Sequence, residues 1–175
     1  MSRRLVVAID GPAASGKSST AIRVASRMGL RHIDSGALYR AATAAYLRVA
    51  TDRDAGRWLE RDVLRAATHH VRLQPAEGGF VPELDGREAD AEIRGAEVTQ
   101  RVSTVASMPG VRAWVNQQVR SLATTHSVVV DGRDIGSTVL PDADLKIFLV
   151  ADPWERARRR LTQRHRREPT DAEIA

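Results

Sequence analysis

The chain has 175 residues and a mass of 19.2 kDa, which is the size of one domain. A hydrophobic share of 42% excludes a disordered chain, and the lack of cysteine excludes disulfides, a thiolate nucleophile and cysteine-ligated zinc. No apolar run reaches the roughly 18 residues of a membrane-spanning helix, and the apolar stretch near the amino terminus is too short for a secretory signal. We therefore expect a cytosolic protein with no membrane partner.

The balance of charge favours an anionic partner. The formal net charge is +5, from 27 basic and 22 acidic residues, and the pI is about 10.6, so nucleic acids and small phosphate compounds both fit. Aromatic residues make up only 4% of the chain, which is too few for a platform that stacks on single-stranded nucleic acid. Small phosphate compounds are therefore the favoured partners, and we expect no nucleic acid.

The first fifty residues predict strands and helices that alternate around a parallel sheet. A continuous apolar run rich in β-branched residues is typical of a strand that is buried on both faces. Gly29 suits a helix end, and Asp34 and Ser35 suit a helix start. The expected elements are strands over 5–9 and 30–33 and helices over 18–28 and about 36–50.

The middle of the chain predicts helices around a small antiparallel region. Alternating apolar residues over roughly 69–90, with an Asp85-Gly86 turn signal, predict this region. It would place His69 and His70 on a strand, where neighbours point to opposite faces, so they show no arrangement typical of metal ligands. The expected helices cover 57–67, 92–107 and 109–125.

The last third returns to strands alternating with helices. Asp152 and Pro153 suit the N-cap and first position of a basic helix. Thr170 and Glu173 form a capping pattern that is typical of the start of a further helix. The alternation of strands and helices also predicts another strand after the basic helix, so we expect the natural protein to continue past Ala175. The expected elements are strands over 128–130 and 145–150 and a helix over about 153–167.

A phosphate-binding motif, G-x-x-x-x-G-K-S, lies between the first strand and the first helix. Backbone N–H groups of such a loop wrap a phosphate chain at a helix N-terminus. Lys17 would reach the β- and γ-phosphates, and the Ser18 hydroxyl would bind Mg²⁺. The alternative is a glycine-rich turn without a ligand. The residues expected to bind ATP here are Gly11, Pro12, Ala13, Ala14, Ser15, Gly16, Lys17, Ser18 and Ser19.

Two more polar segments follow buried strands. DSGALYR begins at Asp34, after the second strand, and DGRDIG begins at Asp131, after the third. Ligands of open α/β sheets bind at the carboxyl ends of the strands. We therefore expect both segments to meet the phosphate loop at one crevice.

These segments together resemble the bacterial cytidylate kinases. The matching stretches are IDGPAASGKS, DSGALYR, VSTVASMPGVR, DGRDIGSTVLPDADLKIFL and the ERARRR helix, which occur in order over essentially the whole chain. The resemblance implies a three-layer α/β P-loop kinase with a parallel core sheet, a small antiparallel and helical insert that binds the nucleoside monophosphate, and an arginine-rich lid. It implies one domain, with its core at 1–50 and 109–152, the insert at about 57–107 and the lid at about 153–175.

The resemblance implies how the acceptor base is read. Ser35 and Asp134 would meet the amino group of cytosine, and Arg112 and Ser103 would meet its acceptor edge. Uracil presents an acceptor in place of that amino group, so this arrangement would reject it. The alternatives are plainer: a helix cap for Ser35, a turn for Asp134, a solvated helix charge for Arg112 and a helix-start residue for Ser103.

The resemblance also implies how the phosphates are held. Arg40 and Arg133 would bind the acceptor phosphate, a task that suits bidentate guanidinium groups, and Tyr39 would pack near the nucleoside. Asp131 would orient water on Mg²⁺. No general base is needed, because the acceptor phosphate is itself the nucleophile, and catalysis rests on positioning and on charge neutralisation by Lys17, Arg133 and Mg²⁺. The catalytic residues expected are therefore Lys17, Arg133 and, through its water on Mg²⁺, Asp131.

The basic helix resembles the lid of nucleotide kinases. Arg156 and Arg160 lie four residues apart, on one helix face, and the resemblance implies that they bind ATP; the alternative is a charged surface helix. The family also has acidic and basic residues beyond the point where this chain ends, which leaves its full catalytic competence open.

The sequence therefore predicts a monomeric, Mg²⁺-dependent enzyme of pyrimidine nucleotide metabolism that converts ATP and CMP or dCMP to ADP and CDP or dCDP. Three alternatives stay open. One is a P-loop kinase for UMP or another small acceptor. The second is a P-loop nucleic-acid-binding protein, and the third is a nucleotide-binding fragment without turnover.

Overall fold

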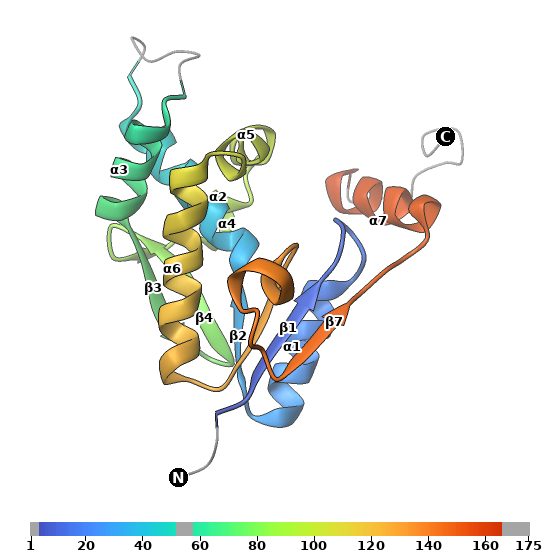
Figure 1. The fold of residues 1–175 in the computed structure, drawn as a ribbon. Helices are drawn as coiled ribbons and strands as arrows, with labels where there is room; N and C mark the ends of the chain where they lie inside the picture. Colours follow the sequence, from blue (N-terminus) through green and yellow to red (C-terminus); the bar gives the residue numbers. More distant parts are fainter. Residues whose placement is uncertain (1–3, 52–57, 166–175) are drawn as a thin grey trace.

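The computed structural model describes residues 4–51 and 58–165, with side chains to residue 162 in the last helix, and shows one central sheet (Figure 1). The strand order is β3-β4-β2-β6-β1-β7, and β5 pairs with β4. The strands β1, β2, β4, β6 and β7 run parallel to their neighbours, whereas β3 and β5 run antiparallel to β4. The strands are β1 (Val6–Asp10), β2 (Arg31–Asp34), β3 (Val71–Ala76), β4 (Gly79–Leu84), β5 (Arg87–Glu88), β6 (Val128–Gly132) and β7 (Leu145–Phe148).

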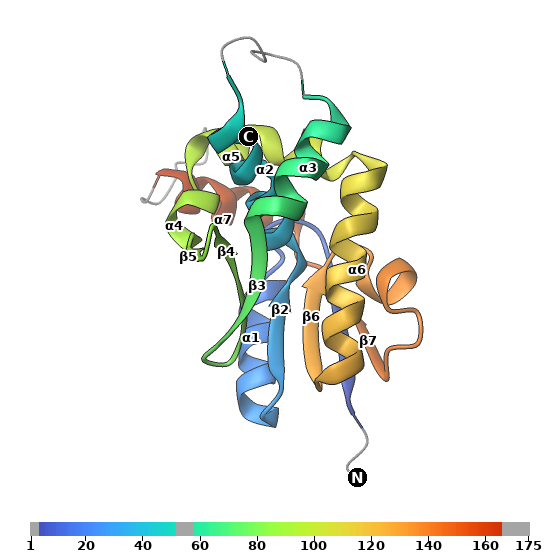
Figure 2. The same ribbon diagram turned by 90° about the vertical axis from the view of Figure 1, so that its left-hand side faces the viewer.

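Helices cover both faces of the sheet, with α1 on one side and α6 on the other (Figure 2). The alternation of side chains along the strands explains the two layers. Val7 and Ile9 of β1 pack with Ala21 of α1, whereas Ala8 between them belongs to the larger cluster on the opposite face. The helices are α1 (Lys17–Met28), α2 (Ser35–Val49), α3 (Glu60–His70), α4 (Asp90–Ile93), α5 (Ala96–Ala106), α6 (Pro109–Thr125) and α7 (Pro153–His165).

This three-layer α/β architecture with a parallel core confirms the predicted fold class. The predicted caps are confirmed as well. Gly29 ends α1 in the left-handed conformation, with φ 65°, and the Asp34 carboxylate accepts a hydrogen bond of 3.0 Å from the Ala37 N–H at the start of α2. Asp152 accepts one of 2.9 Å from the Trp154 N–H at the start of α7. The helix predicted around Thr170 lies outside the described residues.

The placement of His69 and His70 on a strand is wrong. Both residues end α3, and β3 begins at Val71. The Nδ1 atom of His69 lies 2.9 Å from the carbonyl oxygen of Arg65 on the preceding turn of α3, and the same oxygen accepts a hydrogen bond of 3.0 Å from Thr68 Oγ1. The helix therefore continues through residues whose alternation with Val71 imitates a strand.

The single helix predicted over 92–107 is also wrong, because it is two helices. The chain leaves α4 at Arg94, and the Gly95 N–H donates to the Glu92 carbonyl at 3.0 Å, which closes a tight turn. Gly95 then precedes α5 with extended backbone angles (φ −59°, ψ 161°). The break turns α5 across α2, against which it packs.

The predicted antiparallel region is confirmed and extends the core sheet. Asp85 and Gly86 both have positive φ, 54° and 74°, as a two-residue type I′ hairpin requires. Because His32 and Ile33 of β2 pair in parallel with Gly79 and Phe80 of β4, the β3–β4 hairpin continues the core sheet.

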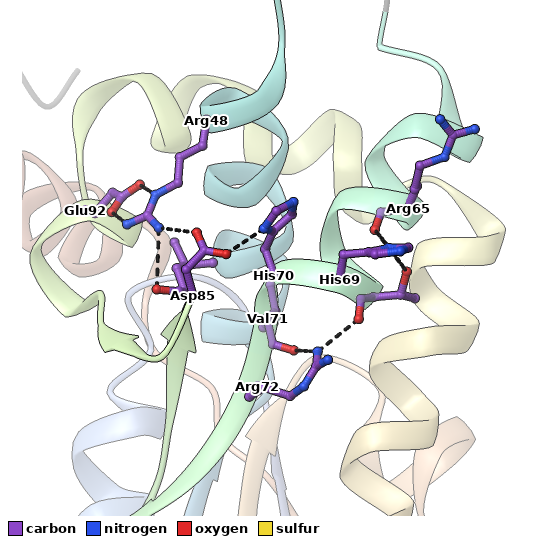
Figure 3. A network of polar contacts seen from close by, with 10 residues as sticks. Arg48, Arg65, His69, His70, Val71, Arg72, Asp85 and Glu92 are labelled. Atoms are coloured by element: carbon purple, nitrogen blue, oxygen red, sulfur yellow. Dashed lines mark hydrogen bonds and ion pairs between the residues drawn. The ribbon is translucent and has the colours of Figure 1, made fainter.

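An ionic network fixes the β4–β5 hairpin, whose turn is Asp85-Gly86, to α2 (Figure 3). The guanidinium of Arg48 donates to Glu92 on α4 and to Asp85 in the hairpin turn, each at 2.8 Å. Asp85 also lies 2.6 Å from Nδ1 of His70 at the end of α3. Hydrogen bonds to His70 and Arg48 lower the pKa of the Asp85 carboxyl. Three separate segments are thus tied to one helix of the core.

Asp10 joins the end of β1 to the segment after β6. Its buried carboxylate accepts hydrogen bonds from the backbone N–H groups of Ile135 and Gly136, at 2.7 and 2.8 Å. These two groups open a single π-helical turn, Ile135–Val139. Helix starts leave such N–H groups without backbone partners, so Asp10 satisfies them from a neighbouring strand.

None of the helices in the described residues combines the length and the apolar composition that a membrane-spanning helix needs.

Replacing Asp10 with alanine is expected to lower the free energy of unfolding by about 3 kcal/mol, because two buried N–H groups lose their acceptors. Urea unfolding followed by circular dichroism measures this change. Asp142→Ala, at an exposed loop position, is the matched control and should shift stability by less than about 0.5 kcal/mol. Equal effects of the two substitutions would contradict the role given to Asp10.

Candidate active site

The phosphate loop joins β1 to α1 in a conformation that depends on its glycines. Gly16, directly before α1, has φ 92°, in the left-handed region that favours glycine. Glycine is required at position 11 for a different reason, which is the close approach of another strand end. A Cβ atom there would lie 2.3 Å from the backbone oxygen of Leu149, closer than any side chain allows. The two fixed glycines of the motif are therefore required by backbone angle and by close packing.

Ser15 supplies an observation that points to a ligand. Within the residues described, its Oγ atom is the one buried side-chain oxygen or nitrogen without a hydrogen-bond partner. An unsatisfied buried hydroxyl costs about 1–3 kcal/mol, and this one lies in the turn that ends at the N-terminus of α1. Phosphate oxygens at this loop would give it acceptors, so the loop fits the phosphate chain of a nucleotide.

Lys17 lies over the loop between charges of both signs. Its Nζ atom donates to the Pro12 carbonyl at 3.3 Å. Burial lowers the pKa of Lys17; the nearby Asp131 opposes that shift and the nearby Arg133 adds to it. Lys17 and Arg133 thus place two cations beside the loop, where they can bind an anion.

Asp131 is the centre of the polar contacts at the strand ends. Ser18 Oγ donates to its Oδ2 atom at 2.6 Å, and His32 Nε2 lies 2.7 Å from its Oδ1 atom. Ser35 Oγ donates to its backbone carbonyl at 2.8 Å. Asp131 itself is only 1% exposed. Mg²⁺ prefers such oxygen ligands and retains several waters, so Ser18 and Asp131 fit the predicted magnesium site.

Asp34 brings a second carboxyl, partly buried, to the same edge. Burial, and then repulsion by Asp131, raise the pKa of Asp34, although the hydrogen bond from Ala37 opposes the shift. Asp34 was predicted only as a helix cap, and in the structure it also lies beside Asp131. The negative charge of these two residues faces the cations of the phosphate loop.

Three residues predicted to meet the acceptor nucleoside come together. Arg112 of α6 forms an ion pair with Asp134, which follows β6. Burial raises the pKa of Tyr39, and the charges of Arg112 and Asp134 also act on its hydroxyl. Arg112, Asp134 and Tyr39 therefore form one cluster, called here the base cluster. Ser103 is exposed on α5, and Ser35 is buried beside Asp131.

Arg40 lies among other guanidinium groups. It donates to Thr99 Oγ1 at 3.0 Å and to the Ile93 carbonyl at 3.3 Å. Burial lowers the pKa of Arg40, and the positive charges of Arg94 and Arg160 lower it further. Arg94 was missed in the sequence, since it is one arginine among many and its neighbour is 54 positions away. Converging cations of this kind favour a bound anion such as a phosphate.

The helix α7 lies beside the phosphate loop (Figure 1). An arginine of α7 that was not selected from the sequence lies near the loop, since a Cβ atom on Gly16 would lie 3.8 Å from an Arg159 nitrogen. Glu155 holds Arg159 at 2.6 Å. Of the two predicted residues, Arg160 acts on Arg40, and Arg156 donates to the Ala151 carbonyl at 3.2 Å.

Comparison with known proteins identifies the family. A family model described as cytidylate kinase matches residues 7–174. The chain belongs to the cytidylate kinase family. The resemblance read from the motifs is thus confirmed, and with it the class of enzyme, a nucleoside monophosphate kinase.

Curated cytidylate kinases resemble the chain along most of its length. It is 42% identical over 170 residues to that of Limosilactobacillus fermentum, covering 95% of this chain and 72% of that protein. It is 43% identical over 161 residues to that of Oceanobacillus iheyensis, covering 91% and 68%. It is 45% identical over 175 residues to that of Symbiobacterium thermophilum, covering 99% and 75%.

The two roles of Asp34 in this family member can be separated by substitution. Asp34→Asn keeps an acceptor for the Ala37 N–H and removes the buried charge, so it should be at least as stable as the wild type at pH 7. Asp34→Ala should be about 1 kcal/mol less stable than Asp34→Asn, because the cap is lost. Urea unfolding measures both differences.

The same substitution has an expected pH dependence. Because the pKa of Asp34 is higher in the folded than in the unfolded protein, ionised Asp34 destabilises the fold. This destabilisation disappears at low pH, where the carboxyl is protonated in the folded and the unfolded protein alike. The advantage of Asp34→Asn over the wild type should therefore shrink as the pH falls from 7 toward about 4, near the unfolded pKa. An advantage that grows with acidity would contradict the repulsion between Asp34 and Asp131.

Proposed function

We propose that the chain transfers the γ-phosphoryl group of ATP to CMP or dCMP and so forms ADP and CDP or dCDP. The observation that carries this proposal is the meeting of the phosphate loop with the base cluster at one end of the sheet. Membership of the cytidylate kinase family supports it. Both nucleotides would lie across the carboxyl ends of β1, β2 and β6, as ligands of open α/β sheets do.

The donor phosphates would bind the loop through its backbone N–H groups, with Ser15 Oγ gaining the partner that it lacks. Lys17 would leave the Pro12 carbonyl for the β- and γ-phosphates. Ser18 and Asp131 would hold Mg²⁺, directly and through water, and the bound ion would neutralise negative charge on the phosphates. Ser19, exposed in the first turn of α1, stays a predicted contact.

The base cluster suits cytosine. The Arg112 guanidinium can donate to N3 and O2 of the base, and the Asp134 carboxylate can accept from the N4 amino group. These two side chains form an ion pair with each other, which keeps both charges satisfied. Ser35 and Ser103 are proposed as further contacts to the base, and Tyr39 as a packing surface for the nucleoside.

Transfer would proceed by positioning and charge neutralisation. Arg40 and Arg133 would hold the acceptor phosphate, whose oxygen attacks the γ-phosphorus in line with the departing ADP oxygen. Lys17 and Arg133 stand close enough to influence each other electrostatically, so their charges can act on the group in transit. Arg156 and Arg160, with Arg159, would close over ATP and exclude water, which prevents its hydrolysis.

We further propose that the protein acts as a monomer in the cytosol on small-molecule substrates, without nucleic acid or membrane partners. The excess of basic residues is then explained by the phosphates that it binds. Arg40 and the two arginines that act on it electrostatically, Arg94 and Arg160, are three of these basic residues.

The proposal is tested by ADP release from the purified chain with Mg–ATP and, separately, CMP, dCMP, UMP, AMP or no acceptor. Turnover is expected with CMP and dCMP alone. Lys17→Ala should reduce it by about 100-fold or more, as loss of one phosphate-stabilising cation does. Turnover confined to another acceptor, or bound nucleotide without turnover, would contradict the proposal.

Asp134→Asn should change the choice of acceptor. The amide keeps the shape of the carboxylate and can donate to O4 of uracil, so the ratio of kcat/KM for CMP to that for UMP should fall by about tenfold or more. Asp142→Asn, on the exposed loop before β7, should leave the ratio unchanged. If the ratio survives in Asp134→Asn, then Asp134 does not read the base.

A further inference from the structure

A histidine on the strand next to β6 contacts the residue at the centre of the site. His32 lies on β2, two positions before Asp34, which pairs with Asp131 in the parallel register. Side chains two positions apart share one face of a strand, so His32 lies on the same face of the sheet as Asp34 and Asp131. Its Nε2 atom lies 2.7 Å from Asp131 Oδ1, and the two side chains are 15% and 2% exposed.

We propose that His32 is a positioning residue, which fixes the Asp131 carboxylate so that Ser18 and Asp131 present their oxygen atoms to the magnesium–nucleotide complex. This inference rests on the proposed function and adds a residue to its site. Nothing in the motifs of the phosphate loop or of the segment after β6 points to His32.

The hydrogen bonds around Asp131 explain how His32 acts. An ionised carboxylate only accepts hydrogen bonds, so His32 Nε2–H must donate to Oδ1 while Ser18 Oγ–H donates to Oδ2. Two donors on two different oxygens hold the plane of the carboxylate. The Ser18 hydroxyl donates its only proton to Asp131 Oδ2, so the lone pairs of its oxygen remain available for a cation.

The loss of His32 has a defined consequence. Asp131 Oδ1 would be left buried without that donor, and Lys17 is a cation on which the Asp131 charge already acts. The carboxylate would turn toward Lys17, which draws the lysine from the phosphates and takes the acceptor from Ser18. Partners that orient metal ligands typically affect metal affinity by 10- to 100-fold.

The inference is tested by calorimetric titration of a non-hydrolysable ATP analogue into the full chain, with magnesium and with EDTA. His32→Leu removes the donor and keeps an apolar volume, and it should reduce the gain in affinity from magnesium by roughly tenfold. His32→Gln places an amide N–H near the position of Nε2 and should restore the gain. His69→Leu, an exposed histidine at the end of α3, is the matched control.

The outcomes separate the possible failures. If the wild type gains affinity from magnesium and His32→Leu gains as much, the role of His32 is overturned and the proposed function stands. A loss that is equal in EDTA and not restored by glutamine would make His32 a structural residue only, which also overturns the inference. If the wild type binds no nucleotide, both proposals fail. Thermal unfolding by circular dichroism confirms that each variant is folded.

Discussion

The pairing of β6 with both β1 and β2 is the constraint on which the site depends. This register sets Asp131 beside Ile9 on one side and beside Asp34 on the other. Because the three strands are parallel, the chain leaves all of them at one edge of the sheet. The phosphate loop, the start of α2 and the segment after β6 meet there, although up to about 120 positions separate them in the sequence.

Buried acidic groups at this edge are tolerated because each has donors. Asp10 accepts two backbone N–H groups, Asp34 caps α2, and Asp131 is held by Ser18 and His32. Burying a polar group without such partners costs free energy, and among the described residues Ser15 Oγ is a buried group that lacks one. The hydrogen bonds of the three acidic side chains are thus satisfied within the protein, whereas Ser15 Oγ would gain its partner from the donor nucleotide at the phosphate loop.

Much of this could be predicted from the sequence because the signals are local. A few adjacent residues are enough to predict the phosphate loop, the helix caps at Asp34 and Asp152, and the hairpin turn at Asp85. The rest depends on distant contacts. His69 and His70 are helical although the alternation of apolar residues predicts a strand. Arg94 approaches Arg40, Arg159 approaches the phosphate loop and His32 approaches Asp131 only when separate segments fold together. The base cluster combines both cases, since its residues were selected by resemblance and brought together by α6.

A crystal structure of the chain with a non-hydrolysable ATP analogue, magnesium and CMP tests the central claim most directly. The account predicts triphosphate oxygens at the loop N–H groups and Ser15 Oγ, and cytosine between Arg112 and Asp134 with its phosphate toward Arg40 and Arg133. It would be contradicted by CMP bound away from the base cluster, for example in the hollow of about 440 Å³ that Asp62, His69 and His70 help to line between α2 and α3.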